Sequence, residues 1–356
     1  MPTRFKRRPR PLRYLGLLLL GGLIWYADPL ELGRVLAGVT PGWLVLAWAL
    51  NFPQLGLKVL RWQTIVRWQG LALGYGHAFL AYFSALLVGF ITPGRLGEMT
   101  KAFTLKHEFG ANLAHAMSSV VLDRMFDMYL LLTLGGLGIL RFALVGDRIS
   151  WPVFGGLCVL LVIPLLLLHP RVVRGIGRAT GRLPGLAPRA ALIEEKVGRF
   201  ADGLAVMRPV RLLVCVVLTA SAYALFFFQC LLCAFALGFT VAFRDLVLMM
   251  AATNFISFMP ISPSGLGTRE ACLTFFLGQT VPPHPPEIAV AFGLVVFLVF
   301  FVGGGLIGFV CWQLAPIDLK RAVHDVRAAA GHPPGPAHPA QRPNTNPGES
   351  GWHGPA

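Results

Sequence analysis

Three long stretches without a charged residue constrain this chain more than any other feature of its sequence. No Asp, Glu, Lys or Arg occurs in residues 149–169, 212–243 or 288–317. A helix of roughly 20 apolar residues crosses the hydrocarbon core of a bilayer, so each stretch is long enough to span it. Hydrophobic residues make up 55% of the 356 residues and charged residues only 13%. This composition excludes a soluble domain and predicts an all-α polytopic membrane protein, since no segment alternates polar and apolar residues like a membrane β-strand.

The net charge of +15 is concentrated at the edges of the apolar segments. There it indicates topology and contact with anionic headgroups, because no nucleic-acid-binding motif accompanies it. The positive-inside rule places the basic tail 1–11, the polar loop 169–210 and the proline- and glycine-rich tail 316–356 in the cytoplasm, the last mostly disordered. Apolar residues at helical spacing from Ala190 to Met207 predict an amphipathic helix. It would lie on the membrane surface, cover the cytoplasmic face, or pack as an ordinary surface helix.

The chain must cross the membrane an even number of times between two cytoplasmic segments. In the membrane domain 12–315 this condition holds only if some apolar segments cross the membrane and others enter and leave on the same side. We predict about six full transmembrane helices, at about 12–27, 42–60, 112–140, 150–168, 211–237 and 288–314. The segments 75–109 and 245–278 then enter and leave on one side as re-entrant helical hairpins. The alternative is eight simple spans. Span 42–60 brings Lys58, Arg61 and Arg67 to the cytoplasmic side.

Two short motifs suggest that the chain contains an internal repeat. The stretch 91-ITPGRLGEMTK-101 aligns with 261-ISPSGLGTREA-271 at an offset of 170 residues. Each motif follows an uncharged segment and would form the tip of one predicted hairpin. An odd number of crossings separates the tips, so the repeat halves, about 42–140 and 211–314, would be inverted. Inverted repeats with broken helices are a common design of membrane transporters.

The motif at each tip combines glycines with an arginine and a glutamate. A helix that begins after such a break offers free backbone N–H groups, and an arginine fork adds affinity for a phosphate or another anionic headgroup. The glutamates could pair with the arginines or contact a cationic group. We therefore predict that the substrate is bound by Gly94, Arg95, Gly97 and Glu98 of the first tip and by Gly265, Gly267, Arg269 and Glu270 of the second.

A second group of charges lies beside the first tip and within the segment 118-SSVVLDRMFDMYLLL-132. Asp123 and Asp127 are four residues apart and share a helix face, and Arg124 can reach Asp127. With Lys101, which also resembles an anchor at the membrane interface, they would form a gate or charge network. A purely structural ion-pair network is the alternative. No catalytic motif, metal-ligand spacing or nucleotide motif is present, so we expect no catalytic residue, metal or cofactor.

Together, the segments TPGRLGE–x2–KAFTLK, VVLDRMFDMYLLL and PISPSGLGTREA resemble the lysylphosphatidylglycerol synthase transmembrane-region family of flippase-like membrane proteins. The resemblance extends over about 12–315. It implies transport of a lipid with an anionic or aminoacylated headgroup, or a link to isoprenoid, hopanoid or glycolipid metabolism. Bifunctional members carry a soluble aminoacyl-transferase domain after the membrane region. We expect none here, because the chain continues only into the tail 316–356.

The function expected from these features is the movement of a polar or anionic lipid between the leaflets of a bacterial inner membrane, by a protein that is not an enzyme. Both termini would be cytoplasmic, and a separate lipid-modifying enzyme is a possible partner. The alternatives are an accessory subunit, or an enzyme, of lipid-linked synthesis. The sequence names neither the lipid nor an energy source.

Overall fold

The computed structural model describes residues 12–92, 97–143, 169–181, 190–257 and 265–314, and six isolated positions between 155 and 166. The predictions for the two tails, for most of the span 150–168, and for the tip residues Gly94 and Arg95 fall outside these residues. Contacts within the chain divide it after Ile317. The description below concerns the unit that ends there.

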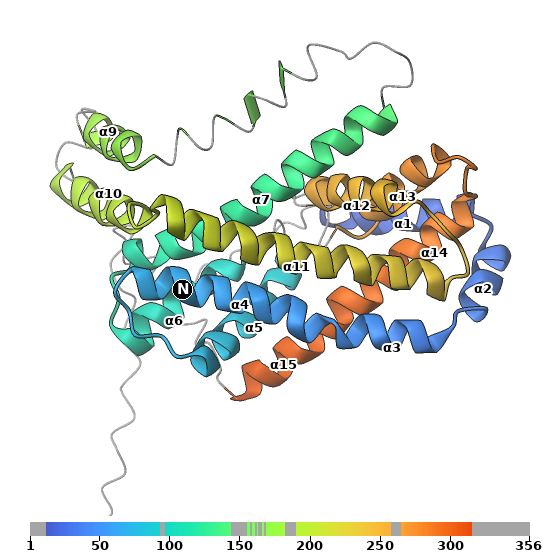
Figure 1. The fold of residues 1–356 in the computed structure, drawn as a ribbon, viewed down its shortest axis with the longest axis horizontal. Helices are drawn as coiled ribbons and strands as arrows, with labels where there is room; N and C mark the ends of the chain where they lie inside the picture. The colour runs from blue at the N-terminus through green and yellow to red at the C-terminus, as the bar shows by residue number, and fades with distance from the viewer. Residues whose placement is uncertain are drawn as a thin grey trace, which may run out of the picture. The chain divides into compact units, whose positions relative to one another are not determined.

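The described residues form helices and contain no strand, which confirms the predicted all-helical class. Four helical segments among them are long and apolar enough to cross a membrane: Pro41–Trp68, Leu113–Phe142, Pro209–Ala236 and Pro286–Leu314. In Figure 1 these are α3 (Pro41–Ala49) with α4 (Asn51–Trp68), α7 (Leu113–Ala143), α11 (Pro209–Ala236), and α14 (Pro286–Phe297) with the π-helical η4 (Leu298–Val302) and α15 (Gly303–Leu314). The first predicted span is the 15-residue helix α1 (Leu12–Tyr26).

Each segment predicted as a hairpin contains two short helices, of which the second begins within the quoted motif. The first pair is α5 (Tyr75–Ile91) and α6 (Thr100–Phe109), and the second is α12 (Phe243–Ser257) and α13 (Thr268–Gly278). The helices of each pair contact one another. With 10 residues in α6 and 11 in α13, these helices are about 15–17 Å long. Neither can cross a hydrocarbon core of about 30 Å alone.

The helix order and its contacts repeat at the offset seen in the motifs. The order α4, α5, α6, α7 in the first half corresponds to α11, α12, α13, α14–α15 in the second. In each half the second short helix packs on the following long helix, as α6 on α7 and α13 on α14. Between the halves, each long helix packs on the first short helix of the other half: α7 on α12, and α15 on α5. The corresponding helices α4 and α11 pack on each other. We call these the exchanged contacts.

The exchanged contacts join antiparallel helices and depend on glycines at matching positions. A Cβ atom at Gly138 of α7 would lie 2.5 Å from the Leu248 carbonyl oxygen of α12. Likewise, a Cβ at Gly308 of α15 would lie 2.7 Å from the Phe83 carbonyl oxygen of α5. Gly138 and Gly308 are also 170 residues apart. Glycine is required at both, since only a helix surface without side chains lets the two backbones approach so closely.

Two shorter helices lie at the ends of the long helices, one where the topology prediction had only a loop and one where it had a helix. The segment after α1 forms a short helix, α2 (Pro29–Ala37), capped by the Asp28 carboxylate, which accepts the Leu30 N–H at 2.9 Å. The predicted amphipathic helix is α10 (Ala190–Leu204), and it packs on α7 and on α9 (Pro170–Gly181). It therefore covers the end of the helix bundle.

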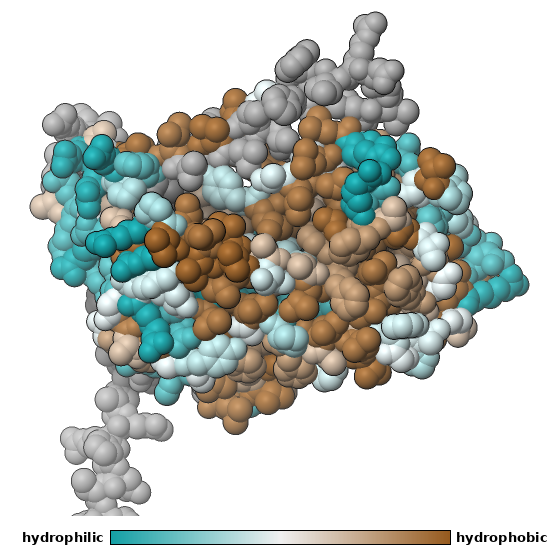
Figure 2. Space-filling view, in the orientation of Figure 1, coloured by the Kyte–Doolittle hydropathy of each residue, from teal (hydrophilic) through white to brown (hydrophobic). Residues whose placement is uncertain are grey.

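The surface agrees with a protein surrounded by lipid. Figure 2 shows hydrophobic side chains over the middle of the face in view, with hydrophilic side chains toward α10 at one end and α2 at the other. Large apolar side chains of α11 are exposed, among them Leu213 at 62% and Val217 at 54%. In a membrane this apolar band would contact acyl chains.

Candidate functional site

A buried ion network joins α4 to α7. The guanidinium of Arg61 lies 2.8 Å from an Asp123 carboxylate oxygen and 2.9 Å from one of Asp127. It also donates a hydrogen bond of 2.7 Å to the Thr219 hydroxyl of α11. All three ionised side chains are at most 1% exposed. Asp123 and Asp127 lie one helical turn apart on the helix face that their spacing predicted, and one arginine therefore reaches both.

Three more cations, one each from α6, α7 and α4, and a third carboxylate, Glu98, complete this network. The ammonium of Lys101 in α6 lies 2.8 Å from Asp123 and 3.9 Å from Glu98. Arg124 binds Glu98 through both terminal nitrogens, at 3.0 and 2.9 Å, and approaches Asp127 at 3.2 Å. Lys58 of α4 lies 3.5 Å from Asp127. Within the described residues this network holds four cations and three carboxylates, a formal charge of +1.

Burial distinguishes two of these cations from what the sequence suggested. Of the two interpretations of Lys101, the anchor at the membrane interface is wrong, because its side chain is 1% exposed and pairs with Asp123 in the charge network. Arg61 was used only to assign the cytoplasmic end of span 42–60, but the helix continues to Trp68 and the Arg61 side chain is buried. The physical reason is the same in both cases. A carboxylate on another helix offsets the cost of removing the cation from water, so the cation need not reach the aqueous side.

The second short helix of the other half carries a smaller ion pair. Arg269 donates two hydrogen bonds to one Glu270 carboxylate oxygen, at 3.1 and 2.9 Å, and its guanidinium lies over the rings of Phe297 and Phe301, about 5 Å from each centroid. The other Glu270 oxygen accepts the Gly267 N–H at 2.6 Å. Glu270 therefore caps the start of α13 with its own carboxylate, in the place predicted for a ligand anion.

The glycines of the two breaks have the backbone roles expected of them where the structure describes them. Gly265 and Gly267 have φ angles of 73° and 81°, a region that favours glycine. A Cβ at Gly97 would lie 2.5 Å from the Val88 backbone, so the chain after the first break passes close against α5. These conformations bring Glu98 and Arg269 to the inside of the helix bundle.

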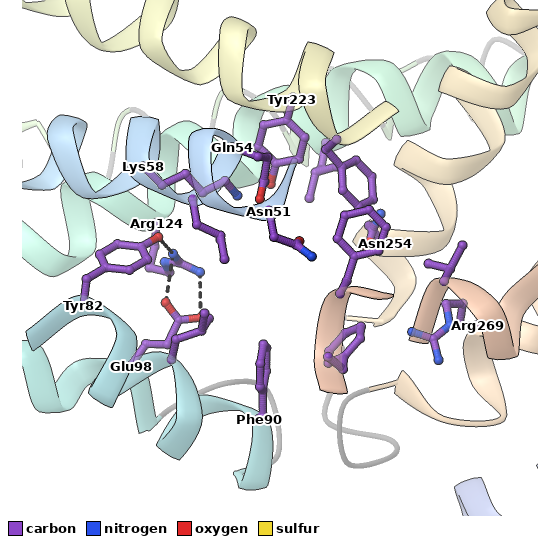
Figure 3. A pocket seen from close by; sticks show the side chains of 17 residues that line it. Asn51, Gln54, Lys58, Tyr82, Phe90, Glu98, Arg124, Tyr223, Asn254 and Arg269 are labelled. Atoms are coloured by element: carbon purple, nitrogen blue, oxygen red, sulfur yellow. Dashed lines mark hydrogen bonds and ion pairs between the residues drawn. The ribbon is translucent and has the colours of Figure 1, made fainter. Parts of the chain in front are cut away.

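One pocket connects the two groups of charges (Figure 3). Glu98, Arg124 and Lys58 line it from the first half, and Arg269 lines it from the second. In Figure 3 the Arg124–Glu98 pair and Arg269 lie on opposite sides, with the amides of Asn51 and Asn254 between them. Other polar lining comes from Gln54, Tyr82 and Tyr223, and apolar lining from Leu55, Leu86, Phe90, Leu131, Phe226, Val296, Phe300 and Phe301.

The predicted site residues thus separate into three groups. Glu98, Arg124 and Arg269 line the pocket. The others are buried but do not line it: Gly97, Lys101, Asp123, Asp127, Gly265, Gly267 and Glu270. Gly94 and Arg95 lie outside the described residues.

Sequence reasoning missed the part played by α4. Lys58 and Arg61 were used only to assign the cytoplasmic side, yet both bind the α7 carboxylates. The sequence did contain evidence for this pairing. Two aspartates four residues apart within an apolar helix require cationic partners, and Lys58 and Arg61 are two cations three residues apart within another apolar helix. Asn51, Gln54 and Asn254 were also missed, although polar residues inside apolar helices usually mark a functional or packing site.

Comparisons with known sequences identify relatives of this chain among membrane proteins. A UPF0104 membrane protein of Methanothermobacter thermautotrophicus is 22% identical over 312 residues, which cover 81% of this chain and 89% of the relative. A UPF0104 membrane protein of Methanocaldococcus jannaschii is 22% identical over 307 residues, covering 82% and 88%. The family model described as lysylphosphatidylglycerol synthase TM region matches residues 13–308, from α1 into α15. The chain belongs to this family of membrane proteins.

Proposed function

We propose that this protein moves a polar or anionic lipid between the two leaflets of a bacterial cytoplasmic membrane, as a flippase-like transporter and not as an enzyme. The observation that carries the proposal is the pocket between the two halves. It places Glu98 and Arg269, one from each broken-helix motif, on a shared cavity among helices long enough to span a membrane. Charged groups at that depth are costly and are characteristic of substrate pathways.

The exchanged packing supports an inverted repeat. Corresponding helices of the two halves, α4 and α11, are antiparallel: Ala47 and Asn51 meet Gln229, while Arg61 meets Thr219. Two equivalent helices that run antiparallel are related by a twofold axis perpendicular to both. If the helices span a membrane, this axis lies in the plane of the membrane. In transporters of this design the binding site lies where the repeats meet, and rocking of one repeat against the other alternates access. The pocket between α5–α6 and α12–α13 occupies that position, and both short pairs act as re-entrant hairpins.

The pocket walls fit a lipid headgroup attached to an apolar tail. Arg124 and Arg269 offer cations, and Asn51, Gln54 and Asn254 offer amides. Phe90, Phe300 and Phe301 add an apolar side that would contact the first carbons of acyl or polyprenyl chains. A wholly water-soluble solute would have less use for this apolar wall.

The test is lipid translocation by purified protein in liposomes that contain NBD-labelled phosphatidylglycerol or NBD-labelled phosphatidylcholine. Dithionite bleaches only the outer leaflet, so bleaching beyond half of the label reports movement between leaflets. We expect faster translocation with wild-type protein than in protein-free liposomes, and loss of the difference with Arg124→Gln. Glu108→Gln, an exposed change on α6, is the control and should keep full activity.

Two outcomes would contradict the proposal. Wild-type protein that moves neither labelled lipid would overturn it, and recovery of a lipid-modifying enzyme with the purified protein would then favour an accessory subunit. A new lipid species, detected by mass spectrometry after incubation of the pure protein with lipid extract, would indicate an enzyme instead.

A further inference from the structure

The Glu98 carboxylate faces the pocket in a way that suggests it occupies a binding position. It contacts Arg124 side-on, with one carboxylate oxygen 3.0 Å from one terminal nitrogen and the other 2.9 Å from the second. A guanidinium forms the same two-pronged contact with a phosphate group. Arg124 is 16% exposed, whereas Glu98 is 3% exposed, so an anion entering the pocket would meet this arginine.

Glu98 is also the carboxylate of the network that can leave with the least loss. Asp123 is held by Arg61 and Lys101, each at 2.8 Å. Glu98 already lies 3.9 Å from the Lys101 ammonium, one helical turn along its own helix, and can turn toward it. Turning the Glu98 carboxylate toward Lys101 therefore exchanges one cationic partner, Arg124, for another.

The corresponding pair in the second half has no such freedom. Glu270 accepts the Gly267 N–H at 2.6 Å through one carboxylate oxygen and two bonds from Arg269 through the other. Its removal would uncap α13 as well as free Arg269. The two Arg–Glu pairs on the pocket are therefore unequal, and the first is the one that can open.

We propose that the pocket binds a phosphate-type oxyanion on Arg124, in the position that the Glu98 carboxylate holds here, and that Glu98 turns to Lys101 as the anion enters. This inference rests on the proposed function and names the chemistry of its substrate: a phosphate monoester or diester. Glu98 thus keeps the buried arginine paired whenever no ligand is bound, which avoids an unpaired buried charge.

A different role for Glu98 gives the opposite result in one variant. If Glu98 contacted a cationic group of the ligand, Glu98→Gln would weaken binding. If Glu98 competes with the ligand for Arg124, the same change removes the competitor and tightens binding. A gain in affinity cannot come from misfolding, so this variant stays informative.

The experiment measures binding by isothermal titration calorimetry, with each probe titrated into the purified full-length protein in dodecyl maltoside, a detergent without phosphate. The probes are dihexanoyl phosphatidylglycerol, inorganic phosphate and, as the uncharged control, dihexanoylglycerol. We expect wild-type protein to bind the phosphatidylglycerol, Glu98→Gln to bind it about tenfold more tightly, and Arg124→Gln to bind it about tenfold more weakly. Glu108→Gln should match wild type, and Arg124→Lys should lie between wild type and Arg124→Gln.

The outcomes separate the possible sources of the anion and the two proposals. Binding of inorganic phosphate as tight as that of the short-chain lipid would identify a free-phosphate site. Binding of the lipid alone would identify a headgroup site. Unchanged or weaker binding by Glu98→Gln, or no binding of either phosphate probe by wild type, overturns the inference even if liposomes show translocation. Tighter binding by Glu98→Gln without translocation by wild type would keep this site and overturn the transport proposal.

Discussion

Arg61 of α4 binds both carboxylates of α7 at once, 2.8 Å from Asp123 and 2.9 Å from Asp127. The contact fixes the position of one long helix relative to another inside a bundle whose core is largely apolar. Lys101 on Asp123 extends the connection to α6 and so to the first broken-helix pair. The network is therefore a structural support for the pocket, and Lys58, Glu98 and Arg124 are its members on the pocket surface.

Asp123→Asn should destabilise the protein strongly. The change leaves Arg61 and Lys101 buried with one charge partner fewer, and removing one member of a buried ion pair costs about 3–5 kcal/mol. Thermal unfolding in detergent, followed by circular dichroism, measures the effect. Asp202→Asn is a matched control, because Asp202 pairs with Arg174 at 2.6 Å on the surface, with its side chain 61% exposed. Its loss should cost less than about 1 kcal/mol, and equal losses for both variants would argue against a supporting network.

Gly138→Ala and Gly308→Ala should destabilise the protein by similar amounts. Each added Cβ would press on the backbone of a helix from the other half, at 2.5 Å from Leu248 and 2.7 Å from Phe83. Overpacking of this kind costs about 1–3 kcal/mol. The same unfolding assay measures both. Gly42→Ala has nothing within 4 Å of the new Cβ and should be neutral or slightly stabilising. If Gly138→Ala lowered the unfolding temperature and Gly308→Ala did not, the two helix contacts would not be equivalent.

Single cysteines at Glu108 and Gln279, in a cysteine-free background, should react with membrane-impermeant maleimide from opposite sides of the membrane. Both positions are exposed and lie just before or just after the end of the second helix of each pair, α6 and α13. Inverted re-entrant pairs place the cysteine of Glu108→Cys on the cytoplasmic side and that of Gln279→Cys on the other. Eight simple spans would instead bring Glu108→Cys outside. Labelling of intact cells against inverted vesicles distinguishes the two topologies.

Arg269→Lys should reduce translocation although it keeps the charge. A lysine cannot reproduce the two hydrogen bonds to Glu270, nor lie flat over the rings of Phe297 and Phe301. We expect a decrease of about tenfold or more in the initial rate of NBD-lipid translocation, with normal yield of folded protein. Arg141→Lys, at an arginine that is 54% exposed, should leave the rate unchanged. A wild-type rate in Arg269→Lys would remove Arg269 from the transport path.

The sequence predicted those features of the arrangement that depend on residues close together in the chain. The spacing of Asp123, Arg124 and Asp127 sets their geometry within one helix, so their shared face and the Arg124–Asp127 contact were predictable. The two breaks were predictable for the same reason, since proline and glycine act on their own backbone. The 170-residue offset of the two motifs also indicated the matching order of helices.

The contacts that sequence reasoning missed are between helices far apart in the chain. The positive-inside rule counts cations near helix ends, but whether Arg61 is buried depends on Asp123, 62 residues later. The pairing of Glu98 with Arg124 likewise depends on how α6 packs on α7. Helix periodicity carries no information on such pairings, and the burial of Lys101 could not be read from its position in the motif.

The exchanged packing also constrains the order in which this protein can fold during synthesis. The helix α5 emerges early, but its partner α15 is the last described helix to leave the ribosome. The Asn51 side chain in α4 likewise waits for its acceptor, the Val299 carbonyl, 248 residues later. Until α15 is made, the face of α5 that will pack on the α15 glycines lacks its final neighbour, and so does the Asn51 side chain. Translation of the last transmembrane segment is therefore the event that completes both halves at once, and a chain truncated before it would leave the first half without its packing partner.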